Sequence, residues 1–458
     1  MKEVSEVKQK FIVDFFKALE EKRDYCILRN YEEYPQKMGD DIDIIVDAKE
    51  GDVIEDVVVP IIKQLGWDYH IKLRQEGFTP VVCMYTTDDT VDICQIDFYT
   101  KFLWRGNQFA DGKAVLDTKV RFKNFLVAGH GADLAITLTK EFMGSGKVRK
   151  KYRTKMANFA KDDKDGFYAV LSGIYGDLTD KLYKYCVNEE FEKIDKLAKP
   201  FKHKVRKQSF LKYLNCSFRG FTARIGNWFH PEGKLIAFVG PDGSGKTTLI
   251  GKLDDYLERF FPHNSKIYHR RYEIFPELKT GLGLSSMKGK IAGGKERVTD
   301  KQQEEIQKKK KRSFLSILAS LFVVFYYTLE YSVGSIMAYR LLTKRTLILY
   351  DRYYYDHFVQ PTTRDVIWPI RHFLLALVRK PNLTVHLIAS GDHIFKRKQD
   401  LNAIEIDNQN YYLNRILKCC KNVEDLNMEQ LNADQVAAEV FRMTINKFYG
   451  FRPKTNAK

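Results

Sequence analysis

The sequence predicts an α/β protein: a C-terminal parallel sheet with helices on both faces, preceded by a small mixed-sheet domain with a helical extension. Three observations lead to this class. Strand-like runs cluster after one helix in the first 110 residues, and apolar runs alternate with helical segments after residue 233. The stretch between them is basic and aromatic and ends in HPEG, whose proline and glycine indicate a boundary. At 458 residues the chain is too long for one ordinary core.

The first domain is expected over residues 1–120. Apolar residues from Phe11 to Leu19 lie on one face of an amphipathic helix, and no signal peptide is visible. A second helix is expected near Pro60, between the second and third strands. The predicted strands are 25–30, 41–47, 69–74, 81–87 and 91–100. A helical extension over 121–195 and a basic linker over 196–232 are expected to follow.

The second domain is expected over residues 233–458. Its predicted strands are 234–240, 266–271, 346–351, 383–389 and 422–426, and the strand–helix–strand order indicates a parallel sheet. Residues 278–312 are predicted to be flexible. The apolar segment 314–339 is interpreted as a buried helix rather than a membrane segment, because its uninterrupted part ends at Glu330, short of a bilayer span.

Positive charge is concentrated in three stretches. The chain carries 76 basic and 59 acidic side chains, a formal charge of +17. The excess lies in residues 147–155, 199–230 and 285–312. Such stretches attract phosphate-bearing partners or are solvated faces. The seven cysteines show no metal-binding or disulfide spacing, which favours a reducing, cytoplasmic location.

Residues 240–247 match the pattern G-x-x-x-x-G-K-[ST] between a strand and a helix. In such a turn the backbone N–H groups and the helix N-terminus hold phosphates. Lys246 would span the β- and γ-phosphates of a nucleotide triphosphate, and Thr247 would ligate Mg²⁺. The candidate nucleotide-binding residues are Gly240, Asp242, Gly243, Ser244, Gly245, Lys246, Thr247 and Thr248.

Two further segments carry candidate catalytic residues. The strand TLILYD ends in Asp351, which can hold the magnesium shell, and the adjacent Arg352 can clamp a phosphate. Residues 390–402 are predicted to form a helix with Lys396, Arg397 and Lys398 near its middle. These cations suit a lid that closes over a transferring phosphoryl group.

The turn GPDGSGKTT, the strand end YDRYYYD and the KRKQD helix together resemble the thymidylate kinase family over about residues 233–450. The resemblance implies ATP and Mg²⁺ as cofactors, γ-phosphoryl transfer to a nucleotide or sugar-like acceptor, and a homodimer. It also implies that Asp242 contacts a sugar hydroxyl, Arg352 holds the acceptor phosphate, and Arg397 belongs to the lid.

Two departures from that family leave the acceptor open. The loop HRRYEIFPELK lacks the usual Glu-Pro-Gly-Gly, and the basic insertion 278–312 precedes the third strand. The variant motifs look similar to a bacterial group with an extra N-terminal domain, associated with cell-surface polysaccharide genes. Glu330 is interpreted as a core carboxylate rather than an acceptor ligand.

The motif GDDIDIIVD predicts a second site, because Asp41 and Asp43 project to one face of a strand. A third carboxylate, Asp97 in preference to Asp92, would complete a site for Mg²⁺. Residues 20–110 resemble the nucleotidyltransferase superfamily. Arg29 and Asn30 stand where that superfamily has Gly-Ser or Gly-Gly, so both an active site and a substrate-binding or vestigial domain stay open.

Two other classes of protein are compatible with the basic stretches. One is a nucleotide-gated nucleic-acid binder, although the chain shows no recognised nucleic-acid module, so no such partner is expected. The other is a peripheral membrane scaffold that uses residues 201–229, where aromatic and basic residues mingle, for weak contact with an anionic membrane.

Overall fold

The structure is a computed structural model that describes residues 2–48, 51–72, 76–261, 264–276, 314–360, 363, 366–397 and 403–449. It divides into two compact units. The first comprises Met1–Thr86 and Val91–Ile225, and the second comprises Gly226–Tyr449. The predicted flexible segment 278–312 lies outside the described residues.

The first unit is built on a seven-stranded mixed sheet in the order β10-β11-β2-β4-β7-β6-β5. The central strands β4 and β7 are parallel, whereas β2, β6 and β5 run antiparallel to their inner neighbours. The strands of this unit are β1 Lys2–Glu3, β2 Tyr25–Ile27, β3 Lys37–Met38, β4 Asp41–Val46, β5 Asp68–Ile71, β6 Phe78–Thr86, β7 Val91–Tyr99, β8 Phe102–Trp104, β9 Asn107–Ala110, β10 Val120–Phe122 and β11 Phe125–Val127.

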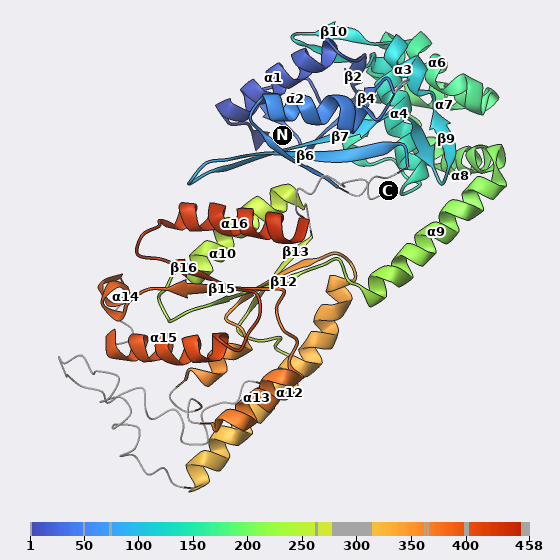
Figure 1. Ribbon diagram of the computed structural model, residues 1–458. Coiled ribbons are helices and arrows are strands. Elements are labelled where there is room, and N and C mark those ends of the chain that lie inside the picture. The colour runs from blue at the N-terminus through green and yellow to red at the C-terminus, as the bar shows by residue number, and fades with distance from the viewer. Residues whose placement is uncertain are drawn as a thin grey trace. The chain divides into compact units, whose positions relative to one another are not determined.

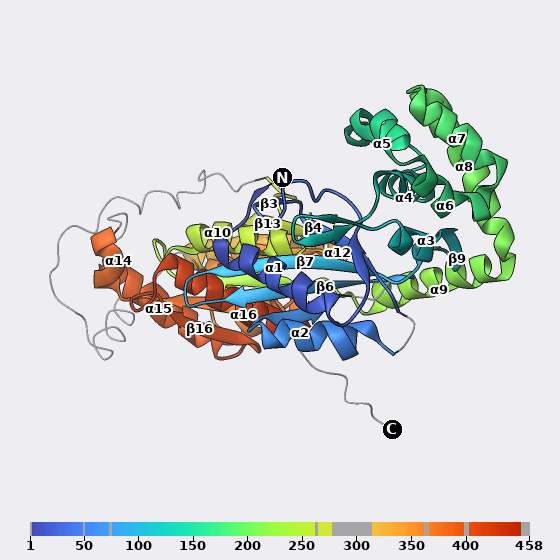
Figure 2. The ribbon, with the colours of Figure 1, turned by 90° about the horizontal axis from the view of Figure 1, so that it is seen from above.

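Helices cover both faces of this sheet. The helix α1 (Glu6–Glu20) buries its apolar face on the sheet and lies across β6 and β7 in Figure 2. Pro60 is tolerated because it falls in the first turn of α2 (Val59–Gln64), which continues the π-helical turn η1 (Ile54–Val58). The other helices are α3 Gly112–Asp117, α4 His130–Met143, η2 Lys150–Lys155, α5 Met156–Asp162, α6 Lys164–Tyr175, α7 Asp177–Val187, α8 Phe191–Gln208 and α9 Phe210–Phe229.

Two predicted boundaries in this unit are wrong. The segment expected as a helical extension over 121–195 begins with strands of the sheet, β10 and β11. Its helices share one apolar core with the sheet, where Phe142 packs in the same cluster as Cys26 and Tyr99. The expected linker over 196–232 is helical, and α8 buries Phe201 and Val205 in that core. The basic residues of α8 conceal an apolar face with helical spacing, which holds the segment in the unit.

The second unit confirms the predicted parallel sheet. Its five strands are all parallel, in the order β13-β14-β12-β15-β16. In Figure 1, α10 and α16 lie on one face of the sheet, and α12, α13 and α15 lie on the other. The elements are β12 Leu235–Val239, α10 Lys246–Phe260, β13 Ser265–His269, α12 Phe314–Leu342, β14 Leu347–Asp351, η4 Tyr354–Phe358, α13 Trp368–Leu377, β15 Leu383–Ile388, α14 Gly391–Arg397, α15 Ala403–Leu417, β16 Val423–Asn427 and α16 Ala433–Tyr449.

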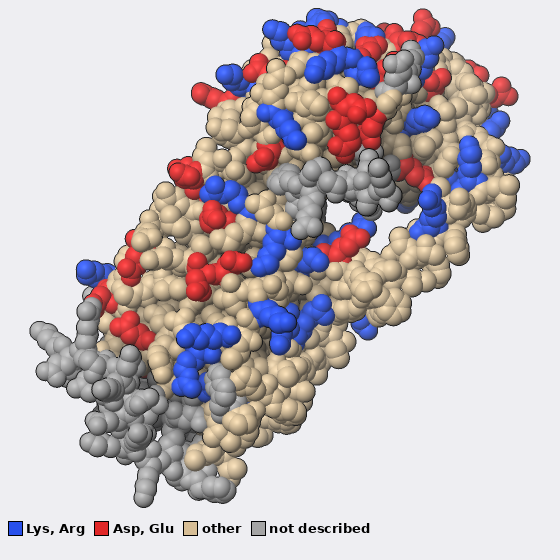
Figure 3. All heavy atoms as spheres, in the orientation of Figure 1, with Lys and Arg blue, Asp and Glu red and all other residues tan. Residues whose placement is uncertain are grey.

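The long helix α12 is buried along one side only. Val324, Tyr331 and Ala338 pack in the core beside the sheet. Phe322 and Ile336, on the opposite side, are exposed, and the surface over α12 is largely without charge in Figure 3. By length and composition alone, Ile317–Leu342 could cross a membrane, with a third of its most apolar window buried. The prediction of a buried helix therefore holds for one face.

Candidate active site

The phosphate-binding turn connects β12, the central strand of the second unit, to α10. Gly240, Gly243 and Gly245 adopt positive φ angles of 154°, 88° and 93°, which a side chain would disfavour. A Cβ at Gly240 would lie 2.7 Å from the carbonyl oxygen of Leu387. Among the described residues, no side chain caps the N-terminus of α10. The turn therefore leaves the first N–H groups of α10 available to an anion.

Lys246 lies within this turn. Its ammonium donates to the carbonyl oxygens of Gly240 and Pro241, each at 2.8 Å, and to the hydroxyl of Ser244 at 3.4 Å. Burial lowers the pKa of Lys246, although nearby carboxylates oppose the shift. Loop carbonyls thus hold the ammonium of Lys246 inside the turn. A phosphate bound there would offer it charged oxygens, which are stronger acceptors.

Thr247 and Asp351 meet at the carboxyl end of the sheet. The Thr247 hydroxyl donates to Asp351 Oδ2 at 2.7 Å. His269 Nδ1, at the end of β13, lies 3.3 Å from the same oxygen. The other oxygen, Oδ1, is buried and has no hydrogen-bond partner among the described residues. A hydroxyl beside an incompletely paired carboxylate fits a Mg²⁺ ion, so Thr247 and Asp351 are the residues that would hold it.

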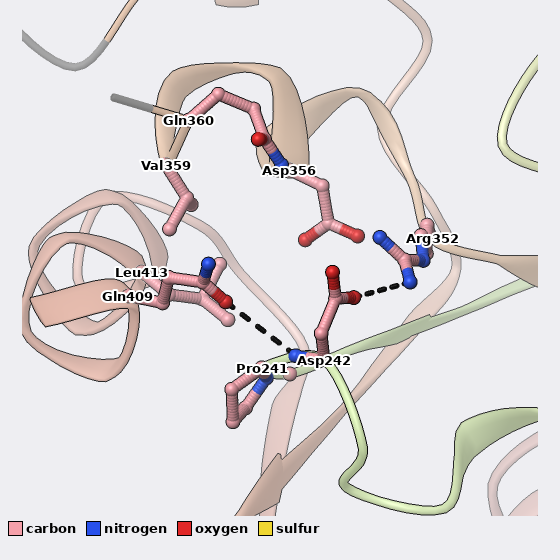
Figure 4. Close-up of a pocket in the computed structure, with 9 residues that line it drawn as sticks. Pro241, Asp242, Arg352, Asp356, Val359, Gln360, Gln409 and Leu413 are labelled. Atoms are coloured by element: carbon pink, nitrogen blue, oxygen red, sulfur yellow. Dashed lines mark hydrogen bonds and ion pairs between the residues drawn. The ribbon is translucent and has the colours of Figure 1, made fainter. Parts of the chain in front are cut away.

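A small pocket opens beside the turn. Its charged lining consists of Asp242, Arg352 and Asp356 (Figure 4). Arg352 adopts a left-handed backbone conformation, φ 68°, and its guanidinium pairs with Asp242. The remaining lining residues are Gly240, Pro241, Val359, Gln360, Gln409 and Leu413.

Asp356 is a site residue that the sequence analysis did not identify. Burial raises the pKa of Asp356 to about 7, although Lys246 and Arg352 oppose the shift. Its Oδ2 is buried without a hydrogen-bond partner among the described residues. A perturbed carboxyl group in a pocket is a functional-site candidate. Asp356 ends the segment YDRYYYD, four residues after Arg352, and this was the available signal.

Gln409 and His269 were also missed. Gln409 Oε1, from α15, accepts a hydrogen bond at 3.4 Å from the backbone N–H of Asp242. His269 reaches Asp351 because β13 and β14 pair in register at these two residues. Neither residue belongs to a motif, so only the fold brings them to the turn.

The remaining candidate residues of the second unit either make none of the contacts above or lie outside the described residues. Thr248 lies in the first turn of α10. The predicted lid helix is α14, which ends at Arg397, and its Lys396 is exposed. The side chain of Arg397 and all of Lys398 lie outside the described residues. Glu330 is buried and pairs with Arg271 at 3.6 Å, which agrees with the interpretation of a core carboxylate.

The first unit brings together the three carboxylates predicted for it. Asp41, Asp43 and Asp97 offer oxygens that lie within 4.8 Å of one another. Asp43 and Asp97 are direct neighbours on the parallel strands β4 and β7, whereas Asp92 pairs with Tyr85 on β6. The choice of Asp97 over Asp92 therefore agrees with the strand register.

Two cations already neutralise Asp43. Arg29 Nε donates to its Oδ2 at 2.6 Å, and Lys140 Nζ, from α4, donates to its Oδ1 at 3.1 Å. Burial alone would raise the pKa of Asp43, but Lys140 and Arg29 hold it below its ordinary value. Burial and the charge of Asp43 raise the pKa of Asp97 to about 6. A divalent ion bound through Asp43 would lie close to a guanidinium and an ammonium, which would repel it. The site is therefore poorly suited to a pair of metal ions.

Comparisons with known proteins give structural likenesses only. No protein-family model matches the chain, and no curated protein matches it. Solved structures that resemble it include the thymidylate kinase from Ehrlichia chaffeensis, 17% identical, with a TM-score of 0.29 over 46% of this chain and 98% of that one. The thymidylate kinase from Candida albicans is 19% identical, with a TM-score of 0.31 over 47% of this chain and 93% of that one.

Proposed function

We propose that the second unit is an ATP- and Mg²⁺-dependent phosphotransferase of the nucleoside monophosphate kinase type. The observation that carries this proposal is the hydrogen bond between Thr247 and Asp351 beside the phosphate-binding turn. It joins the hydroxyl and the carboxylate that a magnesium–nucleotide complex requires, with the ammonium of Lys246 in the same turn. Mg²⁺ would supply charge neutralisation at the phosphates.

The residues of the site have separate roles in this proposal. The N–H groups of the turn and Lys246 bind the β- and γ-phosphates and stabilise charge on the transferring group. Thr247 and Asp351 position the ion, and His269 holds Asp351 in place through its contact with Oδ2. The pocket beside the turn receives the acceptor. Arg397 and Lys398 of the predicted lid would close over the phosphates.

The acceptor in this proposal is a small molecule with at least one hydroxyl group. Asp242, Asp356, Gln360 and Gln409 offer carboxylate and amide groups to it. A nucleoside monophosphate or a sugar of cell-surface polysaccharide assembly would satisfy these groups. For a sugar acceptor, Asp356, with a pKa near 7, is suited to accept the proton of the attacking hydroxyl as the phosphoryl group arrives. A nucleoside monophosphate would attack through an oxygen of its phosphate and would need no such base.

The test is phosphoryl transfer from ATP, with Mg²⁺, to a panel of nucleoside monophosphates and of free and phosphorylated sugars. We expect transfer to at least one member, and none in Lys246→Ala. Asp255→Asn is the matched control, because it alters an exposed residue of the same helix outside the phosphate-binding turn. Equal turnover in Lys246→Ala and the intact protein would exclude this site as the source of activity.

The Asp242–Arg352 ion pair distinguishes two classes of acceptor. A phosphate-bearing acceptor would compete with Asp242 for the guanidinium, so Asp242→Asn would lower its KM. A neutral sugar would lose a hydroxyl partner, so the same substitution would raise its KM by about tenfold. The direction of the change in KM identifies the class.

For the first unit, we propose a nucleotidyltransferase-like fold without two-metal transfer chemistry. The pairing of Asp43 with both Arg29 and Lys140 carries this proposal. Calorimetric titration with Mn²⁺ should detect no tight site in the intact protein. Arg29→Ala removes one competing cation and should strengthen Mn²⁺ binding at the triad by at least about tenfold. Tight Mn²⁺ binding by the intact protein, abolished in Asp97→Asn, would contradict it.

A further inference from the structure

The helix α9 exposes an apolar stripe along its length. Phe210, Leu211, Leu214, Phe218, Phe221 and Ile225 are between 44% and 79% exposed. At 3.6 residues per turn they fall within one arc of roughly 100°. The structure buries none of the residues of α9, although other helices of the first unit bury their apolar faces. α9 thus exposes its apolar face, whereas a surface helix of a soluble protein buries it.

The opposite side of α9 is anchored to its own unit. The Tyr213 hydroxyl accepts a hydrogen bond at 2.7 Å from Arg105, which lies in the turn between β8 and β9. The Tyr213 ring packs 5.6 Å from that of Trp104, measured between centroids. Asn107 donates to the carbonyl oxygen of Ser209, just before the helix, at 3.0 Å. These contacts fix the rotation of α9 about its axis, so that the apolar stripe faces outward.

The charge around the stripe has one sign. Residues 199–230 carry eight basic and no acidic side chains. Within α9, Arg224 lies about 40° beyond one edge of the stripe, whereas Arg219 and Lys212 lie about 80° and 100° beyond the other, and all three are exposed. Before α9, Arg206 and Lys207 at the end of α8 are exposed as well. Most of the surface over α9 in Figure 3 belongs to residues without charge.

From these observations we infer that α9 lies in the plane of an anionic phospholipid membrane, its apolar stripe at the boundary between headgroups and acyl chains. Aromatic and aliphatic residues on one face, with only basic charges on the rest of the helix, are the pattern of interfacial helices. Anionic headgroups match the flanking charge, whereas a second copy of the same stripe would bring like charges together. The helix does not span the bilayer, because its opposite side is held by the β8–β9 turn.

This inference goes beyond the proposed phosphotransfer and predicts where it takes place. A protein held by α9 acts at a membrane surface, so its acceptor can be a component of that surface. The membrane contact depends on residues of the first unit, and Lys246 does not take part in it. Loss of one activity therefore leaves the other measurable.

The test is sedimentation of the full-length protein with phosphatidylcholine vesicles that contain, or lack, phosphatidylglycerol. We expect binding to the anionic vesicles that weakens as the salt concentration rises. Combining Leu211→Ser, Phe218→Ser and Phe221→Ser should lower the partition coefficient at least about a hundredfold. Combining Val7→Ser and Val120→Ser, exposed apolar residues of the first unit outside α9, is the control and should leave binding unchanged.

A second triple variant separates the electrostatic contribution. Lys212→Gln, Arg219→Gln and Arg224→Gln together should weaken binding to anionic vesicles by about a hundredfold. Circular dichroism should show that each variant stays folded, because the substituted side chains are exposed. Two results would overturn the inference: no binding of the intact protein to anionic vesicles, or equal binding after the α9 substitutions. Conversion of a dimer to a monomer by the α9 substitutions, without vesicle binding, would assign the stripe to a second copy.

Discussion

The carboxyl group of Asp356 should make the free energy of unfolding depend on pH. Burial raises its pKa from 3.8 to about 7 in the folded protein. Between these two values the folded state keeps a proton that the unfolded state loses. The contribution of Asp356 to stability is therefore fully present below about pH 4, and it is lost as the pH rises through 7.

The magnitude follows from the size of the shift. One pKa unit corresponds to about 1.4 kcal/mol, and two units separate pH 5 from the folded pKa of about 7. Asp356 should thus reduce the free energy of unfolding by up to about 3 kcal/mol between pH 5 and pH 8. Water that enters the pocket reduces this value, so about 1–3 kcal/mol is expected.

The assay is urea unfolding of the intact protein and of Asp356→Asn at pH 5 and pH 8, with EDTA and no nucleotide. Between pH 5 and pH 8 the intact protein should lose more free energy of unfolding than Asp356→Asn does. Asp97 and Asp133, whose pKa values burial raises to about 6 and about 7, titrate in both proteins and cancel in the comparison. Asp255→Asn, on the exposed face of α10, is the control. Identical pH dependence in the intact protein and Asp356→Asn would refute the reasoning.

Three other predictions concern the two units. Lys246→Ala should reduce ADP release in a coupled assay at least about a hundredfold while the circular dichroism spectrum is unchanged, because the transferring phosphoryl group loses its ammonium. Asp41→Ala combined with Asp43→Ala should leave this ADP release unchanged, since the triad lies in the other unit; a parallel loss would show that the units are coupled. Gly334→Ala should lower the free energy of unfolding by about 1–3 kcal/mol, because its Cβ would lie 2.0 Å from the ring of Tyr272. Thermal unfolding measures this loss, and Gly251→Ala in α10 is its control, because a Cβ there would meet nothing within 4 Å and the substitution should be neutral or stabilising by up to about 1 kcal/mol.

Much of the fold could be predicted because its signals are local. Apolar runs and the turns between them placed all five strands of the second sheet, and five of the seven strands of the first, to within a few residues. The short strands β10 and β11 were missed, because each has only three residues. Parity along β7 showed that an unbulged strand offers only one of Asp92 and Asp97, and the register of β4 with β7 agrees with the preference for Asp97. The boundary at residue 196 failed because lysines dominate the composition of α8, while its buried face depends on a few residues such as Phe201.

The candidate site was predictable only where its residues are contiguous. The phosphate-binding turn is one stretch of chain, and Asp351 ends the strand next to it. The acceptor pocket joins Asp242, Asp356 and Gln409 from three separate elements. The pKa of Asp356 depends on burial within that assembly, so its sequence neighbours alone do not reveal the shift.

The two carboxylate sites of the chain differ in the source of their counter-charge. At Asp43 the protein supplies it, because Arg29 and Lys140 approach both carboxylate oxygens. At Asp351 the contacts on Oδ2 come from a hydroxyl and an imidazole, and Oδ1 has no hydrogen-bond partner among the described residues. A buried carboxylate needs a cation or full hydrogen bonding. The demand for an added cation is therefore greater at Asp351, which favours phosphoryl transfer in the second unit over nucleotidyl transfer in the first.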